Sequence, residues 1–429
     1  MLDIKFIRNN VEKIKQNIKN RGMSFDLERL LSVDEERRRL INEIEPLRAE
    51  QKKVSEEIAK EKEAAIREEK ISSMKKIKEE IVLKEKELKV AEEEFEKLMR
   101  QVPNMIQPDT PIGQSEADNK VLREVGKKPK FKFQPCDYLS LAQELDLIDT
   151  ERAAKVSGSR FGYLKGAAAK LEFALVQMAI DILEKEKFIP VVPPVLIKPE
   201  AMEAMGYIDT EEEKEERYYL EKDDLYLVGT SEQSLGPMHA GEILEEENLP
   251  LRYVGFSSCF RREAGSYGKD TKGILRVHQF DKVEMFSFCQ PEYSIKEHQL
   301  ILKLEEKLMQ ELELPYRVVQ LCSVDFARPS SATFDIEAWL PGQNGGQGQY
   351  RETHSCSNCT DYQARRLNIR YRNKATGKVE FLHTLNGTAF AIGRTIIAIL
   401  ENYQQADGTI KVPKTLSRYC GLKYIGKKK

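Results

Sequence analysis

The first hundred residues constrain the fold most, because their composition suits long exposed helices. They contain 25 lysine and arginine residues and 24 aspartate and glutamate residues, but only one proline, Pro46, and one glycine, Gly22. A stripe of apolar residues recurs through the first part at steps of four and three: Ile7, Val11, Ile14 and Ile18. This spacing places the apolar side chains on one helical face. We therefore expect a helix over residues 3–19, with Arg21 and Gly22 after it as the signal that terminates it.

Two further apolar stripes have the 3.5-residue repeat of a coiled coil. They are Leu40, Ile44, Leu47, Val54 and Ile58, then Ile77, Ile81, Leu88, Ala91, Phe95, Leu98 and Val102. Residues 59–70 between them are mostly Lys, Glu and Ala, so we place the tip of an antiparallel hairpin there. Two helices of about 30 residues each would form an arm about 45 Å long. A proline inside a helix costs about 3 kcal/mol, so either the second helix starts near Pro46 or the arm bends there.

The sequence leaves two uses open for this arm, residues 1–102. A coiled coil can join copies of a chain, or it can bind a different partner, since a two-helix hairpin fills its own seam and leaves its outer face available. A turn-rich linker, residues 103–118, follows the arm and contains three prolines.

The C-terminal part, residues 119–429, mixes strand and helix patterns. Strands are expected over 225–228, 251–256, 277–288, 316–321 and 333–339, and helices over 171–187, 295–312 and 387–403. Because loops rather than crossover helices separate most of these strands, the pattern favours an α+β fold with an antiparallel sheet flanked by helices.

Two segments of this part carry special signals. Residues 188–197 contain three prolines, which predicts an edge strand rather than a central one. Residues 209–217 are a run of charged residues, which predicts a solvated loop.

Net charge, hydropathy and cysteine content indicate in which compartment the protein works and which kinds of partner it can bind. The net charge is −2, so a nucleic-acid partner would have to be held by a local basic surface. No apolar run approaches the roughly 18 residues of a membrane span, and the N-terminus has no signal-peptide core. Seven cysteines, an odd number, indicate a reducing compartment. We expect a soluble cytoplasmic protein with no membrane partner.

The stretch most informative about chemistry is Phe260-Arg261-Arg262-Glu263, followed by a Gly- and Lys-rich loop and then Arg276-Val277-His278-Gln279-Phe280 and Glu284. The sequence has neither a P-loop nor a GxGxxG pattern after a strand. Arginines on two strand-like runs around a lysine-containing loop suit a polyphosphate, because guanidinium groups match phosphate oxygens. An ordinary salt-bridged hairpin would have the same charge pattern.

These residues resemble motif 2 of class II aminoacyl-tRNA synthetases. Asn386-Gly387-Thr388-Ala389-Phe390-Ala391-Ile392-Gly393-Arg394 resembles motif 3, and Phe188 to Pro194 after a helix resembles motif 1. Thr230-Ser231-Glu232, Val156 to Phe161, Ser355 to Asn358 and the N-terminal hairpin narrow the resemblance to the seryl-tRNA synthetase family.

The resemblance implies a homodimer that activates L-serine with ATP to seryl-adenylate and transfers serine to the 3′ end of tRNA(Ser). The arm would then hold the tRNA, and Mg²⁺ would accompany ATP. The serine carboxylate is itself the nucleophile, so catalysis would consist of positioning and charge neutralisation. Whether tRNA(Sec) is also charged stays open. Two alternatives are a related protein without charging activity and a purely structural coiled-coil protein.

The resemblance also assigns site residues. Those for ATP are Arg261, Arg262, Glu263, Arg276, Val277, His278, Gln279, Phe280, Glu352, Thr353, His354, Ser355 and Arg394. Those for serine are Thr230, Ser231, Glu232, Arg261, Glu284 and Thr388. The catalytic residues would be Arg261, bridging the serine carboxylate and the α-phosphate, and Arg394, stacking on the adenine opposite Phe280.

Further roles follow from the same resemblance. Glu263 would bind the adenine amino group, and Arg276 the γ-phosphate. Glu352 and Ser355 would hold Mg²⁺, a cation that prefers oxygen ligands. Thr230 and Glu232 would accept hydrogen bonds from the serine ammonium. Glu284 and Thr388 would hold the serine hydroxyl, and such a site rejects alanine because its polar groups would be left unpaired.

Two residues depart from the family pattern. Lys187 stands where motif 1 usually has Gly, and His354 stands where a Ser usually precedes Ser355, which weakens the expected metal shell at that position. Cys356 and Cys359 form a single CxxC pair, which is either half a zinc site or two small buried thiols.

Overall fold

The computed structural model describes residues 1–264 and 272–426. The Gly- and Lys-rich loop of motif 2, residues 265–271, therefore lies outside the described residues, as does the lysine tail 427–429. Residues 2–19 and 23–103 form one compact unit, and Met1, residues 20–22 and residues 104–429 form the other. No helix among the described residues is both long and apolar enough to cross a membrane.

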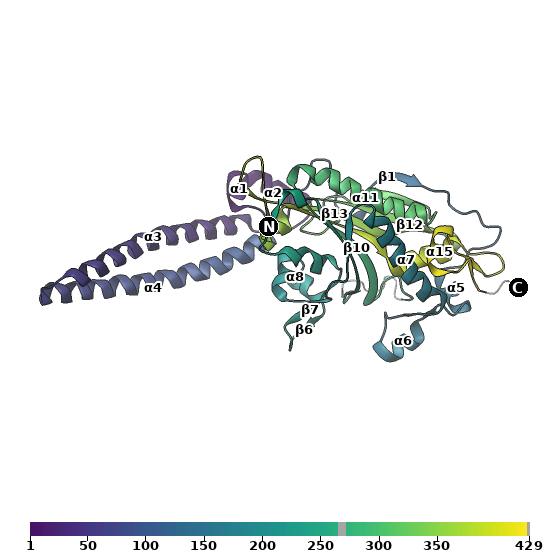
Figure 1. Cartoon of the computed structure of the whole chain (residues 1–429), viewed down its shortest axis with the longest axis horizontal. Helices are drawn as coiled ribbons and strands as arrows, with labels where there is room; N and C mark the ends of the chain where they lie inside the picture. Colours follow the sequence, from purple (N-terminus) through teal and green to yellow (C-terminus); the bar gives the residue numbers. More distant parts are fainter. Residues whose placement is uncertain (265–271, 427–429) are drawn as a thin grey trace. The chain divides into compact units, whose positions relative to one another are not determined.

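The first unit is helical. Helices α1 (Ile4–Asn9) and α2 (Val11–Asn20) precede the long helices α3 (Leu27–Lys60) and α4 (Ala64–Gln101), which lie side by side in Figure 1. The hairpin tip falls at residues 61–63, and the predicted long helical arm is confirmed.

The seam between α3 and α4 contains the apolar stripes that the heptads predict. On α3 the stripe residues Leu40 and Ile44 are buried, and on α4 Ile77, Ile81 and Ala91 are buried. Ion pairs flank this seam, including one between Lys84 Nζ and Glu43 Oε2 at 2.7 Å. The two helices therefore satisfy each other's apolar faces, as the hairpin hypothesis requires.

Two details of the arm differ from the sequence-based expectation. The first helix is interrupted at Asn10, whose side-chain amide donates to the Phe6 carbonyl at 2.9 Å and whose backbone N–H donates to Ile7. Helix α3 begins at Leu27, where Asp26 caps it by accepting from the Arg29 N–H, and it continues through Pro46. The alternative that the helix starts near Pro46 is therefore wrong.

The second unit is built around an eight-stranded sheet with the order β1-β11-β12-β13-β16-β10-β9-β4. Its strands are β1 (Lys120–Val125), β4 (Phe188–Val191), β9 (Leu251–Phe260), β10 (Gln279–Cys289), β11 (Tyr316–Gln320), β12 (Ala332–Leu340), β13 (Gln349–Thr360) and β16 (His383–Ala391). All neighbouring strands run antiparallel except β4, which pairs in parallel with β9. The predicted α+β fold with a large antiparallel sheet is thus confirmed.

Strand β4 lies at the sheet edge, as its proline content predicts. Lys187, just before it, has φ +65°, in the left-handed region that glycine adopts most easily. The backbone at this position therefore suits the Gly that motif 1 usually has, although this chain has Lys.

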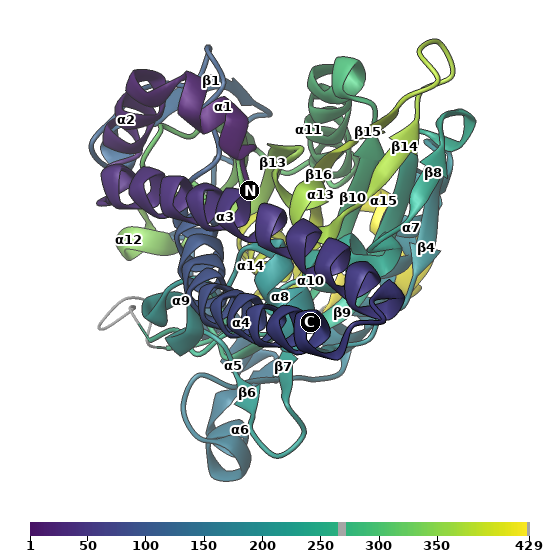
Figure 2. The same ribbon diagram turned by 90° about the vertical axis from the view of Figure 1, so that its left-hand side faces the viewer.

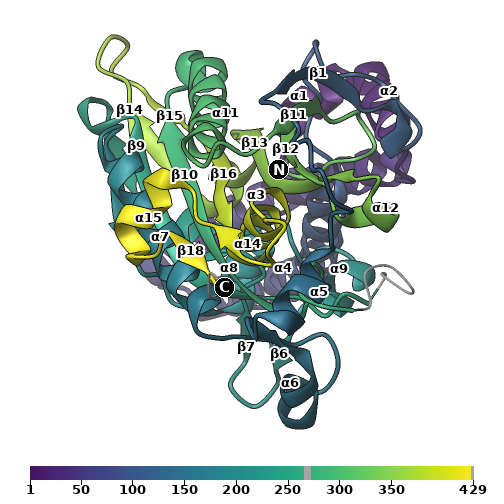
Figure 3. The same cartoon turned by 90° about the vertical axis from the view of Figure 1, so that its right-hand side faces the viewer.

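Three helices form the main cover of the sheet: α7 (Ala167–Glu184), α11 (Ser294–Glu311) and α14 (Ile392–Asn402). Figure 3 shows α7 and α14 near one another, and Figure 2 shows α11 beside β13 and β16. Val283 and Met285 of β10 are fully buried in the core that these helices share. Since side chains alternate along a strand, Lys282 and Glu284 face the opposite side of the sheet.

Three expectations for this unit need correction. Residues 387–391 belong to strand β16, because they pair with β10, so the predicted helix over 387–403 starts only at Ile392. The polar strand β13 lacks the apolar alternation that predicts strands and was not expected. Residues 209–217 are not a solvated loop: they contain helix α9 (Glu211–Glu215), and the Asp209 side chain is fully buried.

Candidate active site

The candidate site lies on the sheet face opposite the helices, over strands β9, β10, β13 and β16. Strand β10 contributes Phe280, Lys282 and Glu284 at alternate positions, which places all three side chains on this face. In the neighbouring strand β16, Thr388 stands opposite Glu284 in the register. Two adjoining cavities open here, and both are lined by Arg261, Lys282, Glu352 and Thr388.

An irregularity in β13 brings Glu352 into the site. The register of β12 and β13 shifts between the pairs Ile336–His354 and Glu337–Glu352, so Thr353 is an extra residue. Glu352 and Ser355 are an odd number of positions apart and would face opposite sides of a regular strand. Because of the bulge, both line the same cavity.

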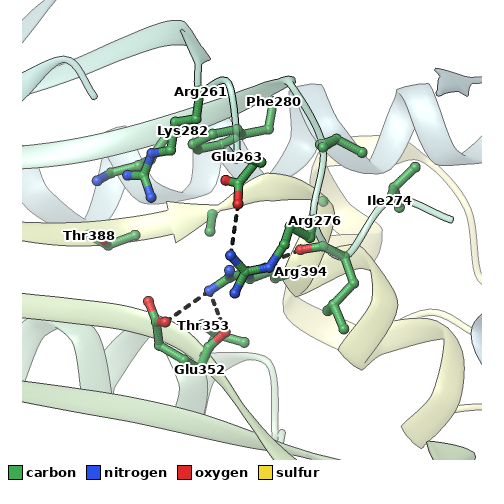
Figure 4. Close-up of a pocket in the computed structure, with 14 residues that line it drawn as sticks. Arg261, Glu263, Ile274, Arg276, Phe280, Lys282, Glu352, Thr353, Thr388 and Arg394 are labelled. Carbon is green, nitrogen blue, oxygen red and sulfur yellow. Dashed lines mark hydrogen bonds and ion pairs between the residues drawn. The ribbon is translucent and has the colours of Figure 1, made fainter. Parts of the chain in front are cut away.

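The first cavity, of about 560 Å³, combines basic, acidic and apolar side chains (Figure 4). Its lining includes Arg261, Glu263, Ile274, Leu275, Arg276, Val277, Phe280, Lys282, Glu352, Thr353, Thr388, Ala391, Gly393 and Arg394. Two ion pairs cross it: Arg276 Nη1 lies 2.7 Å from Glu263 Oε2, and Arg394 Nη1 lies 3.1 Å from Glu352 Oε2. The cavity therefore offers an aromatic ring, aliphatic walls and several guanidinium groups to one ligand.

The position of Arg394 follows from the junction of β16 and α14. Gly393 and Arg394 stand in the first turn of α14, directly after the strand. The Arg394 side chain donates to the backbone carbonyl of Glu352 at 3.1 Å, in addition to the ion pair. Burial acts to raise the pKa of Glu352, but the charges of Arg394 and Arg261 lower it, so this carboxylate is ionised.

The second cavity, of about 880 Å³, is more polar. Its polar lining consists of Tyr207, Arg217, Thr230, Glu232, Gln233, Arg261, Lys282, Glu284, Asp325, Ser330, Thr333, Asp335, Glu352, Ser355, Ser357, Asn386 and Thr388. Arg261 stands between the cavities: its Nε donates to the Gly229 carbonyl at 3.2 Å, and its guanidinium lies 5.2 Å from the centre of the Phe280 ring. A small polar ligand with both a cation and hydroxyl groups would find partners throughout this cavity.

Glu284 is a buried acid of the second cavity whose pKa is raised. It is 1% exposed, and burial raises its pKa to about 7, although Lys282 acts in the opposite direction. The repulsion of Glu232 adds to the rise. At neutral pH this group is therefore poised between accepting and donating a hydrogen bond.

The structure brings most of the predicted site residues to the two cavities, but not all of them. Among the described residues, those predicted for ATP or serine that line neither cavity are Ser231, Arg262, His278, Gln279 and His354. The Ser231 hydroxyl donates to the Gly255 carbonyl at 3.3 Å, and the Arg262 guanidinium lies over the Tyr218 ring. Gln279 lines a third cavity, which shares the side chain of Phe280 with the first cavity.

The two histidines are engaged elsewhere. His278 Nδ1 lies 3.1 Å from the backbone carbonyl of Arg261. His354 is fully buried with its Nδ1 2.8 Å from Thr353 Oγ1, and burial lowers its pKa to about 4. Because His354 points away from the cavity, its replacement of the usual Ser does not remove a ligand from the side that Ser355 faces.

Several residues of the site were not predicted from the sequence. Lys282 stands two positions before Glu284, so the alternation of a strand would have placed it beside the predicted acid. Asn386 is the first residue of the motif 3 resemblance but was given no role. Tyr207, Arg217 and Asp335 carry no local signal, because the segments that contain them meet only in the folded chain.

The donor set at Glu352 fits a hard cation. Asp335 stands opposite Ser355 in the register of β12 and β13, and its Oδ1 is buried with no hydrogen-bond partner among the described residues. Two carboxylates and a hydroxyl are oxygen ligands of the kind that Mg²⁺ prefers. Burial, and then the charge of Glu352, raise the pKa of Asp335 well above its usual value, an effect that a bound cation would relieve.

Cys356 and Cys359 are buried thiols, and burial raises the pKa of both well above the usual range. Within residues 1–264 and 272–426, no cluster of three or more His, Cys, Asp or Glu side chains is arranged to hold a metal ion.

Models of known protein families match segments of both units. The model of the seryl-tRNA synthetase N-terminal domain matches residues 1–106. The model of the class II tRNA synthetase core domain for G, H, P, S and T matches residues 215–403.

Whole-length relatives agree with these matches. The chain is 48% identical to the serine–tRNA ligase of Dictyoglomus thermophilum and 42% identical to that of Borreliella burgdorferi, over 99% or more of each chain. It superposes on the seryl-tRNA synthetase of Pyrococcus horikoshii, solved with ATP, with a TM-score of 0.90 and 41% identity over 100% of both chains. The cytoplasmic enzyme of Naegleria fowleri, solved with AMP, gives a TM-score of 0.86 and 33% identity over 100% of this chain and 99% of that one.

Proposed function

The chain belongs to the seryl-tRNA synthetase family and is a serine–tRNA ligase, and from this premise we propose how its residues divide the work. In the proposed reaction the serine carboxylate attacks the α-phosphate of ATP, the bond to pyrophosphate breaks, and seryl-adenylate forms. Serine is then transferred to the terminal ribose of tRNA(Ser).

One observation carries the proposal: Arg261 stands in the shared wall of two adjoining cavities. A nucleotide in the first cavity and an amino acid in the second would present their reacting groups to the same guanidinium. Arg261 would thus neutralise both the attacking carboxylate and the α-phosphate. This arrangement accelerates the reaction by orientation and charge, without a side chain acting as nucleophile.

The first cavity would hold ATP. The adenine would stack between Phe280 and Arg394, with its amino group toward Glu263, and Arg276 would bind the γ-phosphate. Glu352 and Ser355, with Asp335 beside them, would hold Mg²⁺, which supplies positive charge to the phosphate oxygens.

The second cavity would hold serine. Thr230 and Glu232 would accept from the ammonium group, while Glu284 and Thr388, neighbours in the register of β10 and β16, would hold the hydroxyl. Alanine would leave these two polar groups unpaired, which costs enough to reject it strongly.

The arm, residues 1–102, would bind tRNA through its outer face, while residues 119–429 form the catalytic domain. Support comes from exposed cations of α4 such as Lys75, Lys76 and Lys78, which carry no ion pair among the described residues. Contacts with an RNA duplex would be mostly to phosphates and shape.

The protein would act as a homodimer in the cytoplasm. Large apolar side chains are exposed on α7 and around the edge strand β4: Phe173 is 69% exposed, Ile189 49% and Val192 85%. Such a concentration on one edge is typical of a surface that a second copy covers.

The experiment that tests the proposal is ATP–pyrophosphate exchange with each amino acid in turn, followed by aminoacylation of total tRNA. Exchange should depend on serine, and Arg261→Ala should reduce it by at least a hundredfold. Arg372→Ala, an exposed arginine on strand β14 (Arg370–Arg372), is the matched control and should leave exchange intact. Exchange without serine, or wild-type exchange in Arg261→Ala, contradicts the proposal. Charging of purified tRNA(Sec) in the same assay decides whether it is a second acceptor.

A further inference from the structure

Glu232 is a buried carboxylate held from two sides by side chains that the proposed reaction does not use. Only 4% of the residue is exposed, yet it lines the second cavity. The Tyr207 hydroxyl donates to Glu232 Oε2 at 2.8 Å, and the Gln363 side-chain amide donates to Oε1 at 3.0 Å. Each carboxylate oxygen therefore has one protein donor, and each keeps further lone-pair directions for a ligand.

The orientation of the Gln363 amide is fixed by a third residue. The Thr384 hydroxyl donates to Gln363 Oε1 at 2.7 Å, so the carbonyl end of the amide faces Thr384 and the NH₂ end faces Glu232. Gln363 and Thr384 are both fully buried, so water does not compete for these bonds. The three side chains come from helix α13 (Tyr362–Leu367), strand β16 and helix α10 (Glu232–Leu235).

The position of Tyr207 is equally well determined. Helix α8 (Pro199–Met205), which packs against both α10 and α13 (Figure 2), ends at Gly206 with φ +87°, in the left-handed region. Two residues after Tyr207, the buried Asp209 carboxylate pairs with Arg366 and Arg328. The Arg217 guanidinium covers the Tyr207 ring at 5.3 Å from its centre.

Tyr207 also stays a donor over the whole working pH range. Burial, and then the charge of Glu232, raise the pKa of its hydroxyl well above the usual value. The hydroxyl therefore keeps its proton next to the carboxylate.

We propose that Tyr207 and Gln363 are positioning residues that hold the Glu232 carboxylate in the correct orientation for the ammonium group of the substrate. The inference rests on the proposed function and deepens it, because it names the residues that select for an α-amino group. Without the two donors, the Glu232 carboxylate would lose both of these hydrogen bonds and would be free to rotate. Neither residue touches the reacting atoms.

The test compares two stable mimics of seryl-adenylate: the sulfamoyl analogue with the α-amino group, and its counterpart without it. Calorimetry gives the dissociation constants for the wild-type enzyme, Tyr207→Phe and Gln363→Leu. Losing a hydrogen bond to a charged group should weaken the amino analogue roughly tenfold in Tyr207→Phe. For the analogue without the amino group, the dissociation constant of Tyr207→Phe should lie within about twofold of the wild-type value, since this analogue makes no contact with Glu232.

Tyr253→Phe is the matched control, because this tyrosine hydroxyl lies 2.9 Å from His239 Nε2 and does not line the cavity. Tyr253→Phe should change the dissociation constant of neither analogue. In steady-state exchange, Tyr207→Phe should raise the KM for serine and leave kcat within about threefold.

Equal weakening of both analogues in Tyr207→Phe would overturn the inference, because it would indicate general damage to the cavity. Unchanged binding of both would also overturn it. If Gln363→Leu fails to fold, Tyr207→Phe decides alone, since it keeps the ring. Failure of the proposed function itself would look different, because the wild-type enzyme would then bind neither analogue.

Discussion

The Nζ of Lys282 lies 2.5 Å from Oε2 of Glu284, two residues further along strand β10. Both side chains are nearly inaccessible to solvent and face the second cavity. The pair places a cation next to the acid that we assign to the serine hydroxyl. Burial nevertheless dominates, so the pKa of Glu284 is raised to about 7.

This raised pKa predicts how stability depends on pH. In the unfolded chain the carboxyl ionises with a pKa near its usual value of 4.5, but in the folded protein it keeps its proton up to about pH 7. Between these values the folded state binds more protons, so the contribution of Glu284 to stability falls as pH rises, by up to about 3 kcal/mol.

Glu284→Gln should remove this dependence. The free energy of unfolding of the variant, relative to wild type, should therefore increase from pH 5 to pH 8. Urea titrations monitored by the fluorescence of Trp339, the single tryptophan of the chain, measure it. A difference between the two proteins that does not change with pH would contradict the prediction.

The sequence predicted those parts of the fold that depend on local pattern. The heptads gave the arm, because Leu40, Ile44, Ile77 and Ile81 must share a seam wherever the helices lie. The prolines of residues 188–197 predicted the edge position of β4, because proline has no backbone N–H to donate to a neighbouring strand. These predictions needed no information about distant residues.

What the sequence did not predict depends on contacts between distant segments. Strand β13 is polar and is a strand only because β12 and β16 pair with it. Asp209 lies in a charged run, yet two arginines more than a hundred residues away bury it. Most of the family's motif residues reach the two cavities, and their assigned roles stay predictions. His354, next to the bulge of β13, was assigned to ATP from its place in the motif and faces away.

Asp209→Asn should destabilise the catalytic unit strongly. Its buried carboxylate pairs with Arg366 and Arg328, so the substitution removes the carboxylate with which the buried Arg366 guanidinium pairs, whereas Arg328 keeps its ion pair with Glu213. Such losses amount to about 3–5 kcal/mol. The same urea titration checks this value. Asp223→Asn, at an exposed carboxylate, is the control and should change stability by less than about 0.5 kcal/mol.

Val192→Lys should dissociate the proposed homodimer. Val192 is 85% exposed beside strand β4, and burying an unpaired ammonium in an apolar interface costs several kcal/mol. Sedimentation velocity should give a dimer for wild type and a monomer for the variant at micromolar concentration. Ile295→Lys, at a residue 66% exposed at the start of α11, should remain dimeric. A wild-type monomer, or a dimeric Val192→Lys variant, would refute this assignment of the surface.

Replacing Lys75, Lys76 and Lys78 together by alanine should separate the two steps of the reaction. All three are exposed on α4, whereas both cavities belong to the other unit, so serine-dependent exchange should stay at the wild-type rate. Charging of tRNA(Ser) should fall at least tenfold through a higher KM for tRNA, because phosphate contacts supply much of the affinity.

The salt dependence distinguishes a lost RNA contact from a general defect. Each phosphate contact contributes roughly 0.7–0.9 to the slope of log affinity against log salt, so the triple variant should have a slope smaller by about 2. Replacing Glu68 and Glu69, exposed acids of the same helix, by alanine is the matched control and should not weaken tRNA binding. An unchanged slope in the lysine variant would show that this face of the arm does not contact the phosphates, and the tRNA would then have to be held elsewhere.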